Sequence, residues 1–224
     1  MPPAADSPTP DDFPAQVAAV SPVTVEKEQW RTQLIAARAE RSEPDRVVAT
    51  RALQAHLLAS VAAGGWATIS AYVPFGDEPG SPETLALLQA AGVRILLPRT
   101  GPHDLTWAEY DGTFRPGRLG IMEPTGEDLG PAALSEVDAV LAPALAVDRN
   151  GIRLGYGRGY YDRALQHVPL ERPVLALVYD DELVDTLPCA DYDRPVTHTV
   201  TPLLGTRPII PRHPAIGSSP VVRG

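Results

Sequence analysis

Residues 148–163 read DRNGIRLGYGRGYYDR and carry the clearest structural signal in the chain. Four glycines, at positions 151, 155, 157 and 159, alternate there with arginines and tyrosines. Glycine allows positive φ and lets consecutive N–H groups point into one concave anion site. If a helix begins near Gly159, its N-terminus adds a positive dipole end at the same place. The stretch therefore predicts a loop that binds the phosphates of a nucleotide.

Charged side chains of the same stretch suit that ligand. Arg153 and Arg158 offer forked donors for phosphate oxygens, and Asp162 is a hard oxygen ligand of the kind that Mg²⁺ prefers. The apolar segment 137–147 predicts a buried strand before the loop, and residues 160–167 predict a helix after it. Strand, glycine loop and helix together are the context that a phosphate site needs, although glycine spacing alone also fits a plain hairpin.

Alternating elements continue on both sides of this unit. Patterns of apolar residues, caps and glycines predict helices over 25–40 (capped by Thr24), 44–62 and 82–91, and strands over 66–73, 93–97, 105–110 and 173–179. The second helix is expected to bury Val48, Ala52, Ala55, Leu58 and Val61. This order predicts an α/β fold in which helices cover both faces of a mostly parallel sheet.

Domain organisation follows from length and composition. The chain has 224 residues, 44% of them hydrophobic, which is enough for one full core. Residues 1–23 and 203–224 lack apolar periodicity, so we expect a disordered lead and a mobile proline-rich tail around one domain over 24–202. Neither a secretory signal nor an apolar run of membrane-spanning length is present in the sequence pattern.

Composition also limits the function. The net charge of −9 argues against nucleic acid as a partner. A single cysteine, Cys189, excludes an internal disulfide and fits a reducing compartment, so a cytoplasmic location is expected. Cys189 is interpreted as a small packed residue rather than a nucleophile. His103 and His167 are interpreted as surface histidines, and no Cys/His spacing indicates zinc.

Basic residues are almost all arginine. Lysine and arginine total 19, and Lys27 is the one lysine, which leaves 19 − 1 = 18 arginines. Lys27, Arg31 and Arg38 are spaced to share one face of a helix. That face is either solvated, with Glu26, Glu28 and Glu40 as partners, or a dock for phosphate, to which a compact ammonium is suited.

The segment 72–81 follows an expected strand, where ligands gather in open α/β sheets. Glu78 there can accept hydrogen bonds from the N–H groups of a heterocycle. The alternative is that Asp77 and Glu78 are turn carboxylates without a ligand.

The run from Asp148 to Asp162 resembles the signature of the 5-formyltetrahydrofolate cyclo-ligase (5,10-methenyltetrahydrofolate synthetase) family. That signature is Asp-x-x-Gly-x-Arg-Leu-Gly-x-Gly-x-Gly-Tyr-Tyr-Asp, and every fixed position is present. The resemblance extends over about residues 26–202. It implies a three-layer, Rossmann-like single domain that cyclises 5-formyltetrahydrofolate to 5,10-methenyltetrahydrofolate with ATP and Mg²⁺, releasing ADP and phosphate.

The resemblance also implies a set of site residues. The ATP site would comprise Lys27, Arg31, Arg153, Leu154, Gly155, Tyr156, Gly157, Arg158, Gly159, Tyr160 and Tyr161. The folate site would comprise Val73, Glu78, Tyr156, Gly157, Arg158, Gly159 and Tyr160, with Ser81 standing where the family has threonine. Trp107 and the Glu123-Pro124 pair would border the folate, with core and turn roles as the alternatives.

The same resemblance assigns the metal to Asp162 and Asp193. Tyr192 stands where the family has histidine, a departure that weakens the case for Asp193. Arg158 would stabilise the moving γ-phosphoryl group, and no protein nucleophile is required because phosphorylation turns the formyl oxygen into a leaving group. Two other functions stay open: a sugar-phosphate isomerase or CoA-transferase-like enzyme on the same fold, and a non-catalytic nucleotide- or folate-binding homologue.

Overall fold

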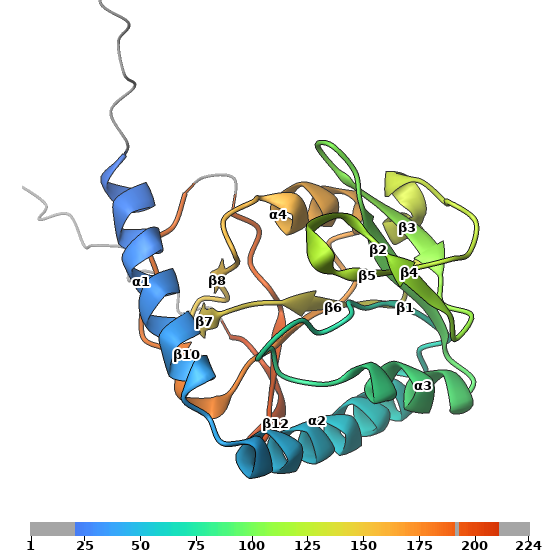
Figure 1. The fold of residues 1–224 in the computed structure, drawn as a ribbon, viewed down its shortest axis with the longest axis horizontal. Helices are drawn as coiled ribbons and strands as arrows, with labels where there is room; N and C mark the ends of the chain where they lie inside the picture. The colour runs from blue at the N-terminus through green and yellow to red at the C-terminus, as the bar shows by residue number, and fades with distance from the viewer. Residues whose placement is uncertain (1–20, 191–192, 211–224) are drawn as a thin grey trace, which may run out of the picture.

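The computed structural model describes residues 21–190 and 193–210. The strands of its main sheet are β1 (Thr68–Ser70), β2 (Arg94–Thr100), β3 (Leu105–Glu109), β6 (Ala139–Pro143), β9 (Val174–Leu177), β11 (His198–Thr201) and β12 (Gly205–Pro208). Their order is β12-β11-β9-β6-β1-β2-β3 (Figure 1). Only the edge strands β12 and β3 run antiparallel to their neighbours. The predicted mostly parallel sheet is confirmed.

Helices cover both faces of this sheet. On one face lie α2 (Glu43–Gly64) and α3 (Pro82–Ala90), and on the other lie η3 (Pro131–Glu136), α4 (Tyr160–Ala164) and η4 (Leu165–His167). Neighbouring residues of β6 serve the two sides, because Val140 packs with Leu165 whereas Leu141 packs with Leu53 of α2. Burial on both faces explains why the central strands read as continuous apolar runs. The three-layer arrangement is confirmed.

The segment 137–147 is two strands rather than the one predicted. After β6 the chain turns into β7 (Ala146–Asp148), which belongs to a separate small sheet with β8 (Arg153–Leu154) and β10 (Leu183–Val184). The carbonyl oxygen of Ala144, between the two strands, accepts a hydrogen bond from Arg38 Nη2 at 2.7 Å instead of from a neighbouring strand. After this break the chain therefore lies against α1 (Pro22–Ala39), which packs on the small sheet (Figure 1).

The predicted buried stripe of α2 is displaced. The buried residues are Ala49, Leu53, Leu57 and Val61, whereas Val48 is 67% exposed. Val61 is buried and Leu58 packs half-buried against the core as predicted, whereas Val48 and Ala55 are exposed. The stripe was misplaced because several registers of an alanine-rich helix look similarly apolar. The helix has a mean hydropathy of 1.2 and is the one described helix long and apolar enough to cross a membrane by composition. Its stripe nevertheless packs against the sheet of this domain.

Both predicted domain boundaries shift. Ser21 rather than Thr24 is the N-cap of α1, since its Oγ accepts the Thr24 N–H. The tail predicted from residue 203 begins with β12, which pairs along its length with β11. A C-terminal truncation that leaves the fold intact must therefore keep the chain through Pro208. The rest of the predicted lead and tail, residues 1–20 and 211–224, lies outside the described residues.

Short elements complete the fold. They are the hairpin of β4 (Phe114–Pro116) and β5 (Met122–Pro124), with η2 (Arg118–Gly120) between its strands, and η5 (Asp180–Glu182). The glycine-rich residues 155–159 follow β8 and lead into α4, as predicted.

Candidate active site

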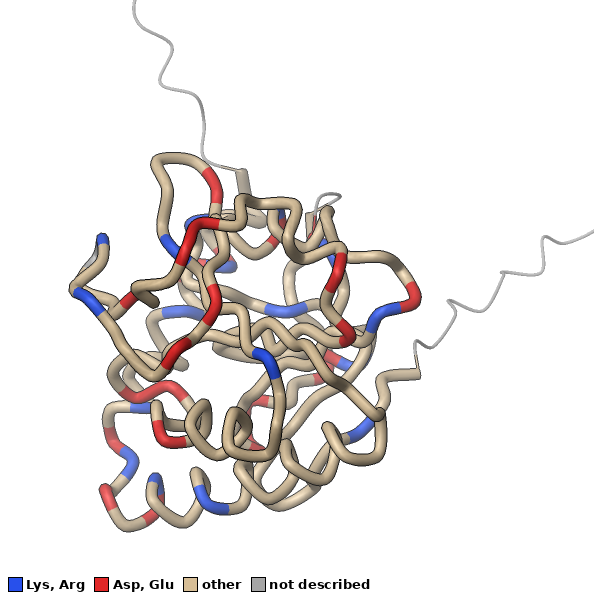
Figure 2. The backbone as a smooth tube through the Cα atoms, turned by 90° about the vertical axis from the view of Figure 1, so that its right-hand side faces the viewer, with Lys and Arg blue, Asp and Glu red and all other residues tan. Residues whose placement is uncertain are grey.

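The basic face of α1 is turned into the protein. Lys27 is 9% exposed and Arg38 is 2% exposed, while Arg31 is half-buried between them. Glu28 pairs with Arg31 at 2.6 Å, but the solvated-face interpretation is wrong for Lys27 and Arg38. In Figure 2 acidic and basic positions are interspersed over the domain. The positive charge at this site therefore comes from a few basic side chains of α1 and not from a net positive surface.

Arg31 joins α1 to the glycine loop, defined here as residues 155–159. Its Nε donates to the Gly155 carbonyl at 2.9 Å. Gly157 has φ +91°, and a Cβ there would lie 3.1 Å from the Arg31 guanidinium carbon. Gly157 is therefore required twice, once for its backbone conformation and once for the close approach of Arg31.

The glycine loop offers a row of unused donors. No backbone N–H from Gly155 to Gly159 donates to an acceptor within the described parts of the chain. Gly157 and Gly159 have positive φ, and Gly155 does not. The α-helical part of α4 is only five residues long, so its dipole is shorter than the sequence predicted. The loop backbone itself carries the anion-binding capacity.

Arg153 points inward rather than to the loop surface. Its side chain is 3% exposed, and its Nη2 donates to Asp162 Oδ1 at 2.6 Å while Nη1 donates to the Arg194 carbonyl at 3.2 Å. Asp162 Oδ2 has no such partner in the described residues, and the Asp162 side chain is 23% exposed. Arg153 thus holds Asp162 in place, and one carboxylate oxygen remains available to a cation.

Asp193 forms an ion pair with Lys27. Lys27 Nζ lies 2.5 Å from Asp193 Oδ2, which also accepts the Ala190 N–H at 2.8 Å, and both side chains are close to fully buried. Within residues 21–190 and 193–210, no group of three or more His, Cys, Asp or Glu side chains could hold a metal. A magnesium ion at Asp162 or Asp193 would need further oxygens from a bound phosphate. Tyr192 lies outside the described residues.

Cys189 is exposed, so its interpretation as a packed residue is wrong. Desolvation and the neighbouring Asp193 charge raise the pKa of the Cys189 thiol. A thiol that stays protonated is a poor nucleophile, and the expected lack of a nucleophilic role agrees with this environment.

Arg38 supports the site, although the sequence indicated only that it shares a helical face with Lys27. Its Nε and Nη2 donate to the two carboxylate oxygens of Glu182 at 2.7 and 2.8 Å, and its Nη1 donates to the Tyr156 hydroxyl at 3.1 Å. Glu182 also accepts the Tyr179 N–H at 2.8 Å. Arg38 shared a predicted face with Lys27, whereas no sequence signal pointed to Glu182. The pair fixes Tyr156 at the edge of the glycine loop.

Glu78 lies near Tyr156, and its charge is close enough to the Tyr156 hydroxyl to add to the effect of burial and raise the pKa of that hydroxyl. Burial raises the pKa of Glu78, although the Phe75 N–H at 2.8 Å partly opposes this. Burial, followed by the Glu78 charge, raises the pKa values of Tyr72, Tyr156 and Tyr161. Three tyrosines therefore lie near one carboxylate. Glu78 also closes its own turn, since its carboxylate accepts the Phe75 N–H and its N–H donates to the Phe75 carbonyl, so the turn role is present as well.

Unpaired polar atoms lie near this carboxylate. The Tyr161 hydroxyl is buried with no hydrogen-bond partner in the described structure. Trp107 packs edge-on against the Tyr161 ring, with the centroids 6.4 Å apart, and is fully buried in the core. Val73 is also buried. For Trp107 the core alternative is the one that the structure supports.

The Glu123-Pro124 pair is a structural corner. Glu123 Oε1 accepts the Thr100 N–H at 2.9 Å, and the Pro124 carbonyl accepts both Arg99 Nε and Arg99 Nη2. Glu123 is 6% exposed. These bonds hold β5 against β2, so the pair belongs to a strand rather than to the turn of the alternative interpretation.

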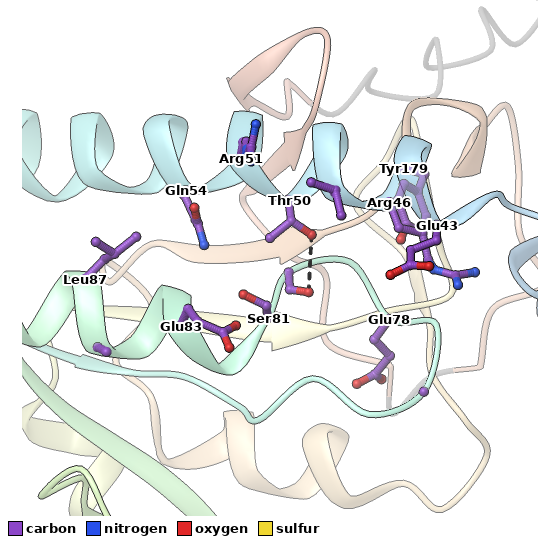
Figure 3. A pocket seen from close by; sticks show the side chains of 14 residues that line it. Glu43, Arg46, Thr50, Arg51, Gln54, Glu78, Ser81, Glu83, Leu87 and Tyr179 are labelled. Atoms are coloured by element: carbon purple, nitrogen blue, oxygen red, sulfur yellow. Dashed lines mark hydrogen bonds between the residues drawn. The ribbon is translucent and has the colours of Figure 1, made fainter.

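A cavity of about 880 Å³ opens behind the 76–81 loop, between α2 and α3 (Figure 3). Thr50 and Ser81 line it, and Thr50 donates to the Gly80 carbonyl at 3.5 Å. Figure 3 shows the Glu78 carboxylate directed away from α2. Glu78 and Ser81 line this cavity from the side of the 76–81 loop.

The fold and the site define an α/β protein with an anion-binding loop beyond its parallel strands, next to a half-buried carboxylate that lies near three tyrosines. Residues 23–202 match the model of the 5-formyltetrahydrofolate cyclo-ligase family. The chain therefore belongs to the 5-formyltetrahydrofolate cyclo-ligase family and is a ligase of folate one-carbon metabolism.

Relatives agree with this membership. The chain is 40% identical over 186 residues to the 5-formyltetrahydrofolate cyclo-ligase of Mycolicibacterium smegmatis, covering 80% of this chain and 95% of that protein. It is 31% identical over 141 residues to the Escherichia coli K12 enzyme of the same name, covering 60% and 78%. The structure of Aquifex aeolicus 5,10-methenyltetrahydrofolate synthetase superposes with a TM-score of 0.65 at 25% identity, covering 85% and 98% of the two chains. The Mycoplasma pneumoniae synthetase, at 19% identity, has the same fold with a TM-score of 0.65, covering 79% and 99%.

Proposed function

We propose that the protein uses ATP and Mg²⁺ to cyclise 5-formyltetrahydrofolate to 5,10-methenyltetrahydrofolate, with release of ADP and phosphate. The observation that carries the nucleotide part is the glycine loop. Five successive N–H groups without an acceptor in the described chain lie beside Arg31 of α1. A phosphate chain supplies the acceptors that these donors lack.

Each cation of the ATP site has a distinct place in this proposal. Lys27 and Arg31 bind phosphate oxygens from the α1 side, and the backbone from Gly155 to Tyr161 cradles the phosphates. Arg158 is exposed and its side chain has no partner in the described residues, so it is free to stabilise the transferring γ-phosphoryl group. Arg153 acts by holding Asp162 rather than by the direct phosphate contact that its sequence position predicted.

The folate lies between Glu78 and the same loop. Glu78 accepts hydrogen bonds from the pteridine N–H groups, Val73 contacts the ring, and Tyr156, Gly157, Gly159 and Tyr160 line its other side. Arg38 keeps the Tyr156 hydroxyl within reach of Glu78. The Glu78 carboxylate is half-buried, which makes a ligand hydrogen bond there stronger than in water.

The carboxylate oxygens of Asp162 and Asp193 are donors of the kind that Mg²⁺ prefers. Asp162 offers one oxygen and Asp193 lies on Lys27, so a metal here would be held by one or two carboxylates together with phosphate oxygens, the usual pattern for Mg²⁺ at nucleotides. When bound, it neutralises charge on the phosphates.

The chemistry needs only positioning and charge stabilisation. The formyl oxygen attacks the γ-phosphorus, the bond to the β,γ-bridging oxygen breaks, and ADP leaves. The second folate nitrogen then attacks the formyl carbon, the carbon–oxygen bond breaks to release phosphate, and this nitrogen loses its proton to solvent. The residues hold the reactants in line and stabilise the transferring charge. With a single cysteine in 224 residues, we place the enzyme in the cytoplasm.

An absorbance assay tests the proposal, because the methenyl product absorbs in the near ultraviolet whereas the formyl substrate does not. Purified protein is expected to form the product only when ATP and Mg²⁺ are both present. Turnover that is equal without nucleotide would favour the isomerase-like alternative, and absence of turnover with bound folate would favour the non-catalytic homologue.

A further inference from the structure

A second cavity, of about 510 Å³, lies between the β2–β3 turn and the start of α4. It is lined by Pro102, His103, Asp104, Arg158, Tyr160 and Arg163. Three of these side chains are basic and one is acidic. Its size is within the range of about 300–1,000 Å³ that is usual for small-molecule sites. Arg158 and Tyr160 also belong to the proposed folate site, whereas the other four residues have no role in the reaction described above.

The wall of this cavity is fixed by hydrogen bonds. Arg163 Nε donates to Asp104 Oδ1 at 2.9 Å, and the same guanidinium donates to the carbonyls of His103 and Arg158. The Tyr160 hydroxyl donates to the Gly101 carbonyl at 3.2 Å. These bonds join the turn to the glycine loop, while the His103 side chain makes no hydrogen bond or ion pair with the described residues. A preformed wall with an available donor is suited to an anionic ligand.

The chemistry of the substrate gives the direction in which it lies. In the proposed function, Glu78 accepts from the pteridine N–H groups, and these lie at the end of the folate opposite to its aminobenzoyl-glutamate arm. Tyr156 lies near Glu78 toward one end of the glycine loop, and Arg158 lines the cavity toward the other end. An arm that extends away from Glu78 along this loop therefore reaches the cavity.

We infer that this cavity binds the glutamate arm of the folate. His103 and Arg163 donate to its carboxylates, and the Tyr160 ring flanks the aminobenzoyl ring. The Arg163 guanidinium lies 5.3 Å from the Tyr160 ring centroid, so charge and aromatic surface adjoin as the arm requires. Further γ-linked glutamates would extend past the same basic wall. This inference rests on the proposed function, because it identifies the place of one part of that substrate.

Two substrates and three variants test the inference. The KM values are measured for 5-formyltetrahydrofolate and for 5-formyltetrahydropteroate, which lacks the glutamate. Arg163→Gln is expected to raise the folate KM about tenfold and His103→Ala about threefold, with the pteroate and ATP KM values unchanged. Arg94→Gln is the matched control, because the Arg94–Glu109 pair is 42% and 52% exposed and the Arg163–Asp104 pair is 45% and 56% exposed.

Other outcomes overturn the inference. Equal increases for folate and pteroate would show that the variants only loosen the turn, and an increase confined to ATP would assign the cavity to the nucleotide. Unchanged KM values in both variants would also reject it. If wild type cyclises no folate at all, the proposed function fails together with this inference. If wild type is active but the ratio of the folate and pteroate KM values stays constant, only the inference fails.

Discussion

The two ends of α1 carry the same kind of side chain in different surroundings. Arg38 near the C-terminal end saturates its guanidinium inside the protein, with Glu182, the Ala144 carbonyl and Tyr156 as acceptors. Lys27 and Arg31 toward the N-terminal end also have protein partners, but Arg31 lies beside five loop N–H groups that have none in the described chain. The difference teaches that unsatisfied polar groups, rather than positive charge alone, distinguish a ligand site from a structural site.

The largest effect is expected at Arg38. Arg38→Met removes the partner of the buried Glu182 and leaves that carboxylate without compensation, which costs about 3–5 kcal/mol. Chemical denaturation should show this loss in the free energy of unfolding. The double variant Arg38→Met/Glu182→Leu should recover much of it, since no buried charge remains unpaired. A loss of stability below about 1 kcal/mol in the single variant would contradict the structural role.

Lys27→Ala is expected to act on both stability and ATP. Because Lys27 is buried on Asp193, the variant should destabilise the fold, in contrast to the small effect expected for an exposed helix position. Loss of the phosphate contact should lower kcat/KM for ATP by about ten- to a hundredfold, which corresponds to about 1.5–3 kcal/mol. The folate KM should change much less. Lys27→Arg should recover only part of the activity, since a planar guanidinium replaces a compact ammonium.

An unchanged kcat/KM for ATP in a folded Lys27→Ala protein would remove the functional contrast between the two ends of α1. In that case Lys27 would be a structural partner of Asp193, as Arg38 is of Glu182.

Glu78 should give the folate kcat/KM a distinctive pH dependence. Burial raises its pKa, so the ionised form that accepts pteridine N–H groups is lost on acidification at a pH above the usual carboxyl value of about 4.3. The same sign means that ionising Glu78 costs stability as the pH rises through the folded-state pKa. Glu78→Gln should remove this acid limb. A limb that persists in the variant would assign it to another group.

A smaller effect is expected for Tyr156→Phe, which removes the hydroxyl that accepts from Arg38 and lies near Glu78. The folate KM should rise about three- to tenfold, because the loss of a hydrogen bond of about 0.5–1.5 kcal/mol frees the Tyr156 ring beside Glu78. The ATP KM should stay constant in the same steady-state measurement. If both KM values change together, Tyr156 serves the whole loop rather than the folate.

Local patterns were enough for the fold class and for part of the site. Apolar runs and glycines predicted the parallel sheet and the helices on both faces, and residues 148–162 predicted the loop. The stripe of α2 was misplaced because alanine-rich helices offer several similar apolar faces. The division of 137–147 into two strands was missed because the Ala144 carbonyl is claimed by Arg38, which lies 106 residues earlier in the chain.

The sequence by itself therefore determined which residues form the glycine loop and that Lys27 and Arg31 share a helical face, because both follow from local spacing. The tertiary structure decided that Arg153 holds Asp162, that Arg38 pairs with Glu182, and that Trp107 is core. Ion pairs and burial depend on which distant segments the sheet brings together. Periodicity carries no information about such contacts, since they are set by packing across layers rather than along the chain.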